Sequence, residues 1–202
     1  MKLDPFYLIV DRASWIERLA PLGLKLVQLR VKDLEGEALR AEIRSAKAIC
    51  DRFAITLVIN DFWQLAIEEG CDWVHLGQED LADADLGAIR AAGLKFGLSS
   101  HDDAELDTAI AAKPDYIALG PVFPTILKKM KWAPQGLEKL RVWKDRIGDI
   151  PLVAIGGLTP ERARAALDHG ADIASVVTDI TLNDDPEART LEWIAATRKA
   201  RG

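Results

Sequence analysis

Gly70-Cys71-Asp72-Trp73-Val74 is a segment in which a helical stretch ends, the chain turns, and an aspartate leads into an apolar run. The same scheme returns at Lys113-Pro114-Asp115-Tyr116-Ile117 and at Gly170-Ala171-Asp172-Ile173-Ala174. Because the copies are unevenly spaced, they indicate a repeated helix-to-strand connection and not a solenoid, whose period would be fixed. The chain is therefore expected to alternate helices with strands.

Outward from these connections, short apolar runs alternate with amphipathic stretches along the chain. The runs are nearly continuous in apolar residues, as parallel strands covered on both faces should be. Gly36–Arg52 has apolar residues at helical spacing, and Thr159-Pro160-Glu161 places a capping hydroxyl before a first-turn proline. The predicted strands are Phe6–Val10, Leu26–Arg30, Thr56–Asn60, Trp73–Gly77, Lys95–Ser99, Tyr116–Gly120, Leu152–Gly156 and Ile173–Val177.

Eight such units follow one another without a Pro-, Gly- or Ser-rich linker. They predict one α/β domain over residues 1–202, folded as a single (β/α)8 TIM barrel. An open, doubly wound sheet is the alternative, and the even repetition of the units favours closure. Asp184–Gly202 is expected to form the closing helix, with Leu191, Trp193 and Ile194 on its core face.

Composition excludes several classes of protein. The 202 residues carry a net charge of -6, which argues against a general nucleic-acid binder, so any anion site must be a local cationic patch. No apolar run approaches a membrane span. Cys50 and Cys71 are too few and too scattered for a disulfide framework or a Cys-rich metal site. We expect a cytoplasmic protein that binds small molecules, with homo-oligomer formation left open.

Polar side chains collect where the predicted strands end, which is where barrels place their active sites. Gln28, Arg30 and Lys32 alternate along the second strand and beyond it, so all three point toward the interior and mouth of the barrel. Buried Arg and Lys are costly unless they are paired with anions, which favours a phosphate-bearing ligand. An internal salt bridge with a barrel carboxylate is the alternative.

Two carboxylates follow the next two strands. Asp61 comes directly after the third strand, and Asp80 follows the fourth in Gly77-Gln78-Glu79-Asp80. Neighbouring strands lie about 4.8 Å apart, so the two side chains can face each other. Paired carboxylates beside Arg and Lys suit a Mg²⁺ ion that is shared with a diphosphate. The alternative gives each a structural role, Asp61 as a helix N-cap and Asp80 as a loop acceptor.

The later strand ends carry further candidates. Gly120–Lys131 contains two prolines, a threonine and three lysines, which suits a loop that closes over an anionic substrate, although a solvated basic loop would have the same composition. Gly156-Gly157 follows the seventh strand and Val177-Thr178 ends the eighth, at the usual phosphate-binding positions of barrel enzymes. The three histidines lack partners at metal-ligand or catalytic-triad spacing, so we interpret them as mainly structural.

Together these motifs resemble the thiamine-phosphate synthase family. The resemblance runs from about Phe6 to Ile180. It implies a transferase that condenses 4-amino-5-hydroxymethyl-2-methylpyrimidine diphosphate with hydroxyethylthiazole phosphate, giving thiamine phosphate and diphosphate. It rests on Gln28-Leu29-Arg30-Val31-Lys32, Ile59-Asn60-Asp61, Val74-His75-Leu76-Gly77-Gln78-Glu79-Asp80, Gly97-Leu98-Ser99, Gly120-Pro121-Val122-Phe123-Pro124-Thr125 and Ala154-Ile155-Gly156-Gly157.

The resemblance also implies roles for individual residues. Arg30, Lys32 and Lys128 would neutralise the departing diphosphate, and Asp61 and Asp80 would bind the Mg²⁺ cofactor. The family's chemistry passes through a pyrimidine-methyl cation that the thiazole nitrogen traps, so no strong general base is needed. The pyrimidine diphosphate would be held by Gln28, Arg30, Lys32, Asn60, Ser99 and Lys128, and the thiazole phosphate by Thr125, Gly157, Val177 and Thr178.

Three positions depart from the family pattern. Leu127 stands where a threonine is usual, Phe62 stands where a second aspartate is common, and Thr178 replaces a serine. Two alternative functions are a thiazole tautomerase-like isomerase and a non-catalytic paralogue that binds or senses thiamine precursors. The isomerase is disfavoured because Pro121 occupies the position of that enzyme's acid/base histidine.

Overall fold

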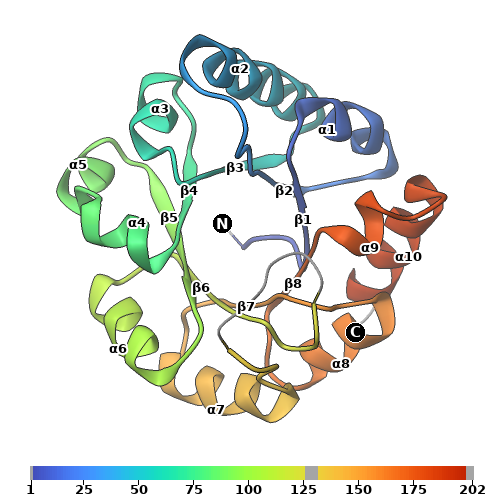
Figure 1. The fold of residues 1–202 in the computed structure, drawn as a ribbon. Coiled ribbons are helices and arrows are strands. Elements are labelled where there is room, and N and C mark those ends of the chain that lie inside the picture. The colour runs from blue at the N-terminus through green and yellow to red at the C-terminus, as the bar shows by residue number, and fades with distance from the viewer. Residues whose placement is uncertain (1, 126–131, 199–202) are drawn as a thin grey trace.

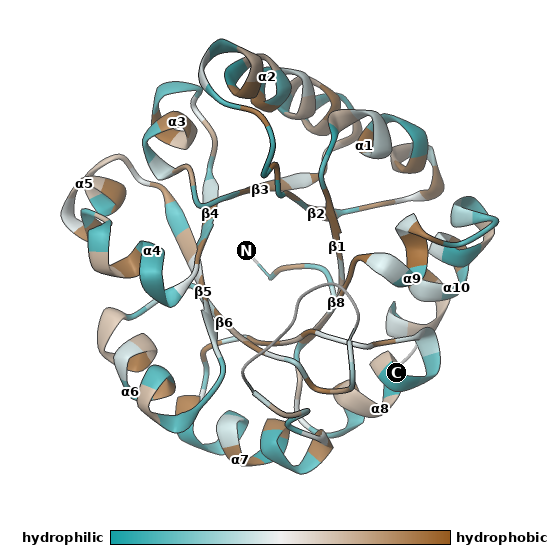
Figure 2. Cartoon of the chain, viewed as in Figure 1, coloured by the Kyte–Doolittle hydropathy of each residue, from teal (hydrophilic) through white to brown (hydrophobic). Residues whose placement is uncertain are grey.

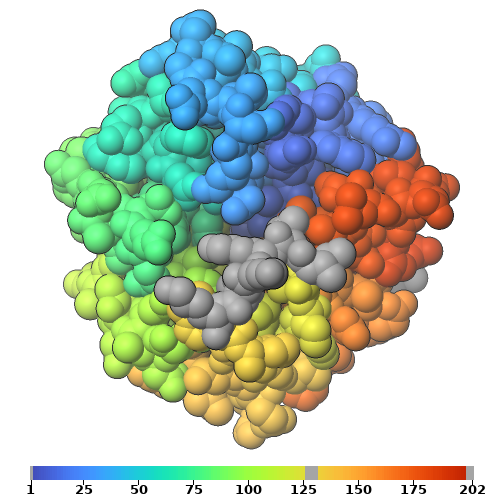
Figure 3. Space-filling view, viewed as in Figure 1, coloured from blue at the N-terminus to red at the C-terminus, as the bar shows by residue number. Residues whose placement is uncertain are grey.

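The computed structural model describes residues 2–125 and 132–198 and has eight parallel strands closed into a barrel, with the helices outside it (Figure 1). Consecutive strands pair in chain order, and the ring closes where Phe6 of the first strand pairs with Ala174 of the last. Figure 3 shows the same face, with the blue N-terminal elements beside the red C-terminal helices. The predicted (β/α)8 barrel is confirmed, and the open-sheet alternative is wrong.

The strands lie within two residues of their predicted ends. β5 runs one residue further than predicted, whereas β2, β4, β6, β7 and β8 stop one or two residues earlier. The observed strands are β1 (Phe6–Val10), β2 (Leu26–Leu29), β3 (Thr56–Asn60), β4 (Trp73–Leu76), β5 (Lys95–Ser100), β6 (Tyr116–Leu119), β7 (Leu152–Ala154) and β8 (Ile173–Val176).

Helices connect the strands around the outside, and two of them follow β4. Within the described residues none is long and apolar enough to cross a membrane. The predicted cap of α8 is confirmed, because the Thr159 side chain accepts a hydrogen bond from Arg162 N. The helices are α1 (Ala13–Leu19), the 3₁₀ helix η1 (Ala20–Leu22), α2 (Gly36–Phe53), α3 (Trp63–Glu68), α4 (Gln78–Asp83), α5 (Leu86–Ala91), α6 (Asp103–Ala112), α7 (Leu137–Ile147), α8 (Pro160–Asp168), α9 (Thr178–Thr181) and α10 (Pro186–Arg198).

The strand side chains supply two cores because they alternate between the two faces of the sheet. On β1, Phe6, Leu8 and Val10 point outward into the main core beneath the helices, while Tyr7 belongs to a separate cluster inside the barrel. Figure 2 shows apolar residues along the strands, whereas the helices carry hydrophobic and hydrophilic residues together. This double burial explains why the strands read as continuous apolar runs.

The lower part of the barrel interior is filled by aromatic rings. Tyr116 packs edge-on against Tyr7 with ring centroids 6.0 Å apart, and its ring is tilted against Trp73 at 6.2 Å. Leu3, from the N-terminal segment that lies across the barrel in Figure 1, joins this cluster. The open space of the barrel therefore lies toward the carboxyl ends of the strands.

Gly97 makes room for the Tyr116 ring. It pairs with Tyr116 on one side and with His75 on the other. A Cβ atom built on Gly97 would lie 1.9 Å from Cζ of Tyr116, so the ring occupies the space that a side chain on β5 would take. The absence of that side chain lets Tyr116 reach across β5 to His75.

The closing helix forms as α10, but the prediction for one of its residues is wrong. Leu191, expected on the core face, is 49% exposed. The buried positions of α10 are Pro186, Thr190, Trp193 and Thr197, which follow a helical stripe that passes beside Leu191. Trp193 sets this stripe because its ring stacks on Phe6, and its Nε1 donates to Asp179.

The contact between Gly97 and Tyr116 gives a test of the inner core. Gly97→Ala is expected to lower the free energy of unfolding in urea by about 1–3 kcal/mol, because the added methyl group overlaps the ring. In a double-mutant cycle with Tyr116→Ala, the double variant should lose less stability than the sum of the two single variants. Strict additivity would show that the ring is not what excludes a side chain at this position.

Candidate active site

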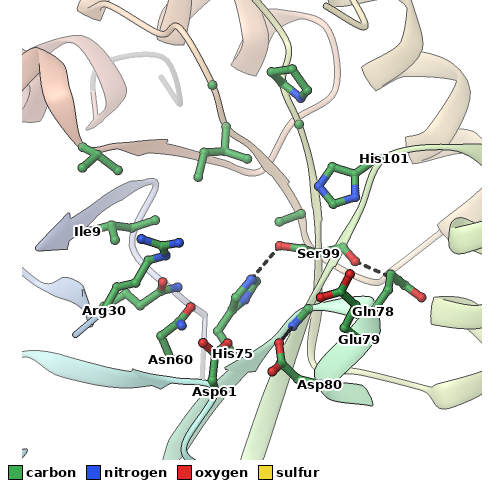
Figure 4. A pocket seen from close by; sticks show the side chains of 18 of the residues that line it. Ile9, Arg30, Asn60, Asp61, His75, Gln78, Glu79, Asp80, Ser99 and His101 are labelled. Carbon is green, nitrogen blue, oxygen red and sulfur yellow. Dashed lines mark hydrogen bonds between the residues drawn. The ribbon is translucent and has the colours of Figure 1, made fainter. Parts of the chain in front are cut away.

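A cavity of about 610 Å³ opens at the carboxyl ends of the strands, where the aromatic cluster stops. Side chains from around the barrel converge on it, as Figure 4 shows for ten labelled residues. Its lining is mixed, with a few apolar residues among many polar ones. The residues that line it are Ile9, Gln28, Arg30, Lys32, Asn60, Asp61, His75, Gly77, Gln78, Glu79, Asp80, Ser99, His101, Glu105, Ala118, Gly120, Pro121, Thr125, Trp132, Ile155, Gly156 and Val177.

Most of the residues predicted from the sequence lie in this one cavity. Gly157 and Thr178 are not among its lining residues, and Lys128 lies outside the described residues. Thr125 and Trp132, the described residues nearest to Lys128 on either side, both line the cavity. The predicted residues that the structure brings together are Gln28, Arg30, Lys32, Asn60, Asp61, Asp80, Ser99, Thr125 and Val177.

Asp61 and Asp80 lie side by side, as their strand positions predicted. Burial raises the pKa of Asp61, the neighbouring Lys32 lowers it, and the nearby Asp80 raises it again. Asp61 has a positive φ of 64°, an uncommon conformation for a residue with a side chain, which aspartate adopts more readily than most residues. The conformation is held in part by a hydrogen bond of 2.9 Å from Asp61 N to His75 O.

The structural alternatives for the two aspartates fare differently. The N-cap position of α3 is Phe62, and no side chain among the described residues caps this helix, so Asp61 does not act as an N-cap. Asp80 does accept a loop hydrogen bond, 3.0 Å from Gly77 N to its Oδ2. One oxygen of Asp80 is therefore engaged by the backbone, while its carboxylate still contacts Asp61.

The two cations of the described lining have different partners. Lys32 Nζ forms an ion pair with Oδ2 of Asp61, whose side chain is only 16% exposed. The guanidinium of Arg30 has no hydrogen bond or ion pair with any residue of 2–125 or 132–198. The internal salt bridge considered from the sequence thus holds for Lys32, whereas Arg30 remains available to an anion.

His75 stands at the centre of a buried hydrogen-bond chain. Its Nε2 lies 2.7 Å from Oγ of Ser99, and its Nδ1 lies 2.8 Å from the hydroxyl of Tyr116. The Tyr116 hydroxyl lies 2.9 Å from that of Tyr7, which accepts a hydrogen bond of 2.8 Å from Nε2 of Gln28. Burial lowers the pKa of His75 to about 4, with Asp80 opposing and Arg30 adding to the shift, so the imidazole is neutral near pH 7.

The rim beside β5 carries a second histidine. The His101 ring stacks on Trp132 with centroids 4.1 Å apart, and its Nδ1 lies 2.7 Å from Oε2 of Glu105. Trp132 Nε1 in turn lies 3.4 Å from Oδ2 of Asp102. These contacts give the cavity an aromatic wall on this side.

Gly156 and Gly157 pack against the start of the loop after β6. Cβ atoms added to them would lie 2.7 Å from Cα of Pro121 and 2.2 Å from the carbonyl oxygen of Pro124, respectively. Val122 N and Phe123 N donate to the carbonyls of Ile155 and Gly156. The glycine pair therefore lets the loop after β6 pack closely against it. This packing fixes the path of the loop toward Thr125.

Several lining residues were missed by the sequence interpretation, which assigned no site role to His75, Gln78, Glu79, His101 or Glu105. His75 had a usable signal, because Trp73 and His75 alternate on β4 and so share the inward face. Glu105 had none, since it comes from the first turn of α6 and reaches the cavity only through the path of the chain after β5.

Comparison with known proteins points to one family. The family model described as "Thiamine monophosphate synthase" matches residues 6–180. The thiamine-phosphate synthase of Rhizobium etli is 68% identical over 197 residues, which cover 98% of this chain and 97% of that protein. The thiamine-phosphate synthase of Salmonella newport is 50% identical over 191 residues, covering 95% and 87%.

A solved structure gives the same indication. Thiamine phosphate pyrophosphorylase from Pyrococcus furiosus superimposes with a TM-score of 0.86 at 25% sequence identity. The superposition covers 98% of this chain and 96% of that one.

The charges around Asp61 make a testable pair. Lys32→Gln should raise the pKa of Asp61 further, because it removes the cation that stabilises the carboxylate, while Asp80→Asn should lower it by removing a like charge. Carboxyl ¹³C NMR titration of the metal-free protein measures both shifts. Shifts in the same direction for the two variants would contradict the assigned contacts.

Proposed function

This chain belongs to the thiamine monophosphate synthase family, and from that premise we propose how its barrel mouth makes thiamine phosphate. The protein is a transferase that joins hydroxymethylpyrimidine diphosphate to hydroxyethylthiazole phosphate and releases diphosphate. The observation that carries the proposal is the convergence of Arg30, Lys32, Asp61, Asp80 and Ser99 on one cavity at the carboxyl ends of the strands.

Arg30, Lys32 and Lys128 are proposed to neutralise the charge that builds on the departing diphosphate. Arg30 supports this role best, since its guanidinium has no partner within the described residues and offers a fork of donors that matches phosphate oxygens. Lys32 would move from Asp61 toward the diphosphate, or bridge the two. Stabilising charge on a leaving group at a fixed site is among the largest contributions to catalysis.

Charge balance supports a Mg²⁺ ion in the same cavity. The described lining holds the carboxylates of Asp61, Glu79, Asp80 and Glu105 against two cations, and a diphosphate would add further negative charge. Asp61 and Asp80 are the residues that would hold the ion, since their carboxylates already contact each other.

The donor set also fits this metal. Within the described residues no group of three or more His, Cys, Asp or Glu side chains could hold a metal, so the shell would be completed by water and substrate. Mg²⁺ typically binds through one or two carboxylates together with phosphate oxygens. When bound, it would withdraw charge from the diphosphate and orient it.

The pyrimidine is proposed to bind between Gln28, Asn60 and Ser99, above the aromatic cluster. The Asn60 side chain is buried and makes no hydrogen bond with the described residues, so its amide can serve a ligand. Apolar contact would come from Ile9 and Ala118, which line the same part of the cavity. A few polar groups among apolar residues suit a flat heteroaromatic ring, because the polar groups fix its orientation.

The thiazole phosphate is proposed to bind at Thr125, Gly157, Val177 and Thr178. Thr125 and Val177 line the cavity, which supports their role. Gly157 lies against Pro124, so it would act in part by holding the loop that presents Thr125. With Leu127 at a position where the family usually has threonine, one hydroxyl donor is missing, which would weaken this phosphate site by about 1–3 kcal/mol.

The chemical step is then mainly dissociation and capture. Loss of diphosphate leaves a methyl cation that the pyrimidine ring stabilises, and the thiazole nitrogen, held on the other side, attacks it. No strong base is required, and His75 is a weak one because burial lowers its pKa to about 4. Positioning the two substrates accounts for most of the remaining acceleration.

A diphosphate-release assay tests the proposal. With both substrates saturating, the protein should release diphosphate and form thiamine phosphate only when Mg²⁺ is present, and a chelator should abolish turnover. Asp80→Asn should lower kcat about a hundredfold or more, because the metal and the charge that it supplies are lost. Asp83→Asn, an exposed carboxylate on the same helix, is the matched control and should retain normal activity.

Two results would overturn the proposal. Absence of diphosphate release with both substrates saturating would exclude the synthase activity. Full Mg²⁺-dependent activity in Asp80→Asn would exclude this carboxylate as a metal ligand while leaving the activity itself in place.

A further inference from the structure

The hydrogen-bond chain inside the barrel has a direction. It begins at Gln28, whose Nε2 donates to the Tyr7 hydroxyl over 2.8 Å, and it ends at Ser99 Oγ at the mouth of the cavity. Gln28, Tyr7, Tyr116 and His75 are all buried. Buried polar groups pair nearly always, because an unpaired donor costs about 1–3 kcal/mol. The requirement that every donor be paired therefore restricts which atom donates in each hydrogen bond of this series.

Only one arrangement satisfies every donor. The Tyr7 hydroxyl accepts from Gln28, and the only other hydrogen-bond partner of that hydroxyl within the described residues is the Tyr116 hydroxyl at 2.9 Å, so Tyr7 donates to Tyr116. Tyr116 then has its own proton to place, and Nδ1 of His75 lies 2.8 Å away. In the reverse arrangement the Tyr7 proton would be buried without an acceptor.

The hydrogen bond from Tyr116 determines which nitrogen of the His75 imidazole carries the proton, and so which group donates to Ser99 at the mouth of the cavity. An Nδ1 atom that accepts from Tyr116 carries no proton, so the proton of the neutral ring is on Nε2, which lies 2.7 Å from Ser99 Oγ. Ser99 then accepts from His75, and its own hydroxyl proton points to the cavity that Ser99 lines. Gln78 Nε2 holds the Ser99 carbonyl over 2.8 Å, which fixes the backbone at the same residue, as Figure 4 shows.

We propose that His75 is a positioning residue. As the Nε2–H tautomer it turns the Ser99 hydroxyl into a hydrogen-bond donor toward the pyrimidine substrate, with the orientation set by Tyr116, Tyr7 and Gln28. The part of this inference that concerns substrate rests on the proposed function. Ser99 thus recognises an acceptor atom of the substrate, such as a ring nitrogen, and discriminates against a donor at the same place.

The first test is the tautomer itself. The protein has three histidines, so ¹⁵N-resolved NMR of the ligand-free protein at about pH 8 can assign His75 with the help of a His75→Gln variant. The proposal expects a single tautomer with the proton on Nε2. A proton on Nδ1, or an even mixture of the two tautomers, would overturn the proposal. Because this measurement needs no substrate, it tests the tautomer independently of whether the protein has synthase activity.

The second test asks whether Tyr116 acts through Ser99. Tyr116 does not line the cavity, so Tyr116→Phe removes a hydroxyl that contacts His75 and not the ligand. It should release the tautomer preference of His75 and lower kcat/KM about three- to tenfold, as expected for one hydrogen bond of ordinary strength. In the Ser99→Ala background, Tyr116→Phe should cause little further loss.

Ser175→Ala is the matched control. Ser175 faces the same barrel interior on β8 beside Tyr7, and its Oγ is the one buried side-chain nitrogen or oxygen atom of the described residues without a hydrogen-bond partner. Ser175→Ala removes a buried hydroxyl that takes no part in the hydrogen bonds between Gln28 and Ser99. The His75 tautomer and the activity should therefore both be unchanged. Equal losses of kcat/KM from Tyr116→Phe in the wild-type and Ser99→Ala backgrounds would show that Tyr116 does not act through Ser99. That result would refute the proposal.

Discussion

The packing of Tyr116 over Gly97 is the constraint on which the rest of this barrel depends. A closed eight-stranded barrel must fill its interior with side chains, and here large aromatic rings do so from below. Tyr116 can lie across β5 only because Gly97 has no side chain. The same placement brings the Tyr116 hydroxyl within hydrogen-bond distance of His75. The Tyr116 ring therefore closes the bottom of the cavity, and its hydroxyl supplies a polar group there.

Polar atoms within this interior must be paired, and that requirement links the core to the mouth. Tyr7 and Tyr116 are too deeply buried to meet solvent, and burial raises the pKa of both hydroxyls, so both keep their protons. These hydroxyls connect by hydrogen bonds to His75, which is too deeply buried to be charged near pH 7. Charge is thereby confined to the mouth, where Arg30, Lys32, Asp61 and Asp80 are at least partly exposed to water.

Strand order and the main site could be predicted from the sequence because both follow from local periodicity. Apolar runs give the strands, and the barrel rule places their ends together. Alternation along β2 and just beyond it places Gln28 and Arg30 on the inner side. Asp61 and Asp80 were found for the same reason. All of these predictions depend on residues close to a strand terminus, where the geometry allows little freedom.

What the sequence did not reveal depends on contacts between distant residues. The closeness of Gly97 and Tyr116 and the direction of the hydrogen-bond chain from Gln28 to Ser99 require residues from five strands, β1, β2, β4, β5 and β6, to meet. Leu191 was misjudged because hydrophobicity alone did not show that Trp193 would orient α10 by stacking on Phe6. His75 looked structural because its partners are not near it in the chain.

The glycine pair after β7 shows how such a distant contact can change the meaning of a motif. Gly-Gly at this position suggested a backbone open to a phosphate, yet the space beside both glycines is taken by Pro121 and Pro124. Backbone hydrogen bonds from Val122 and Phe123 to Ile155 and Gly156, directly after β7, complete the attachment. The loop after β6 is therefore anchored to the segment that follows β7 before it reaches Thr125. Substitution of either glycine would then disturb the proposed phosphate site through the loop, even where the glycine touches no ligand.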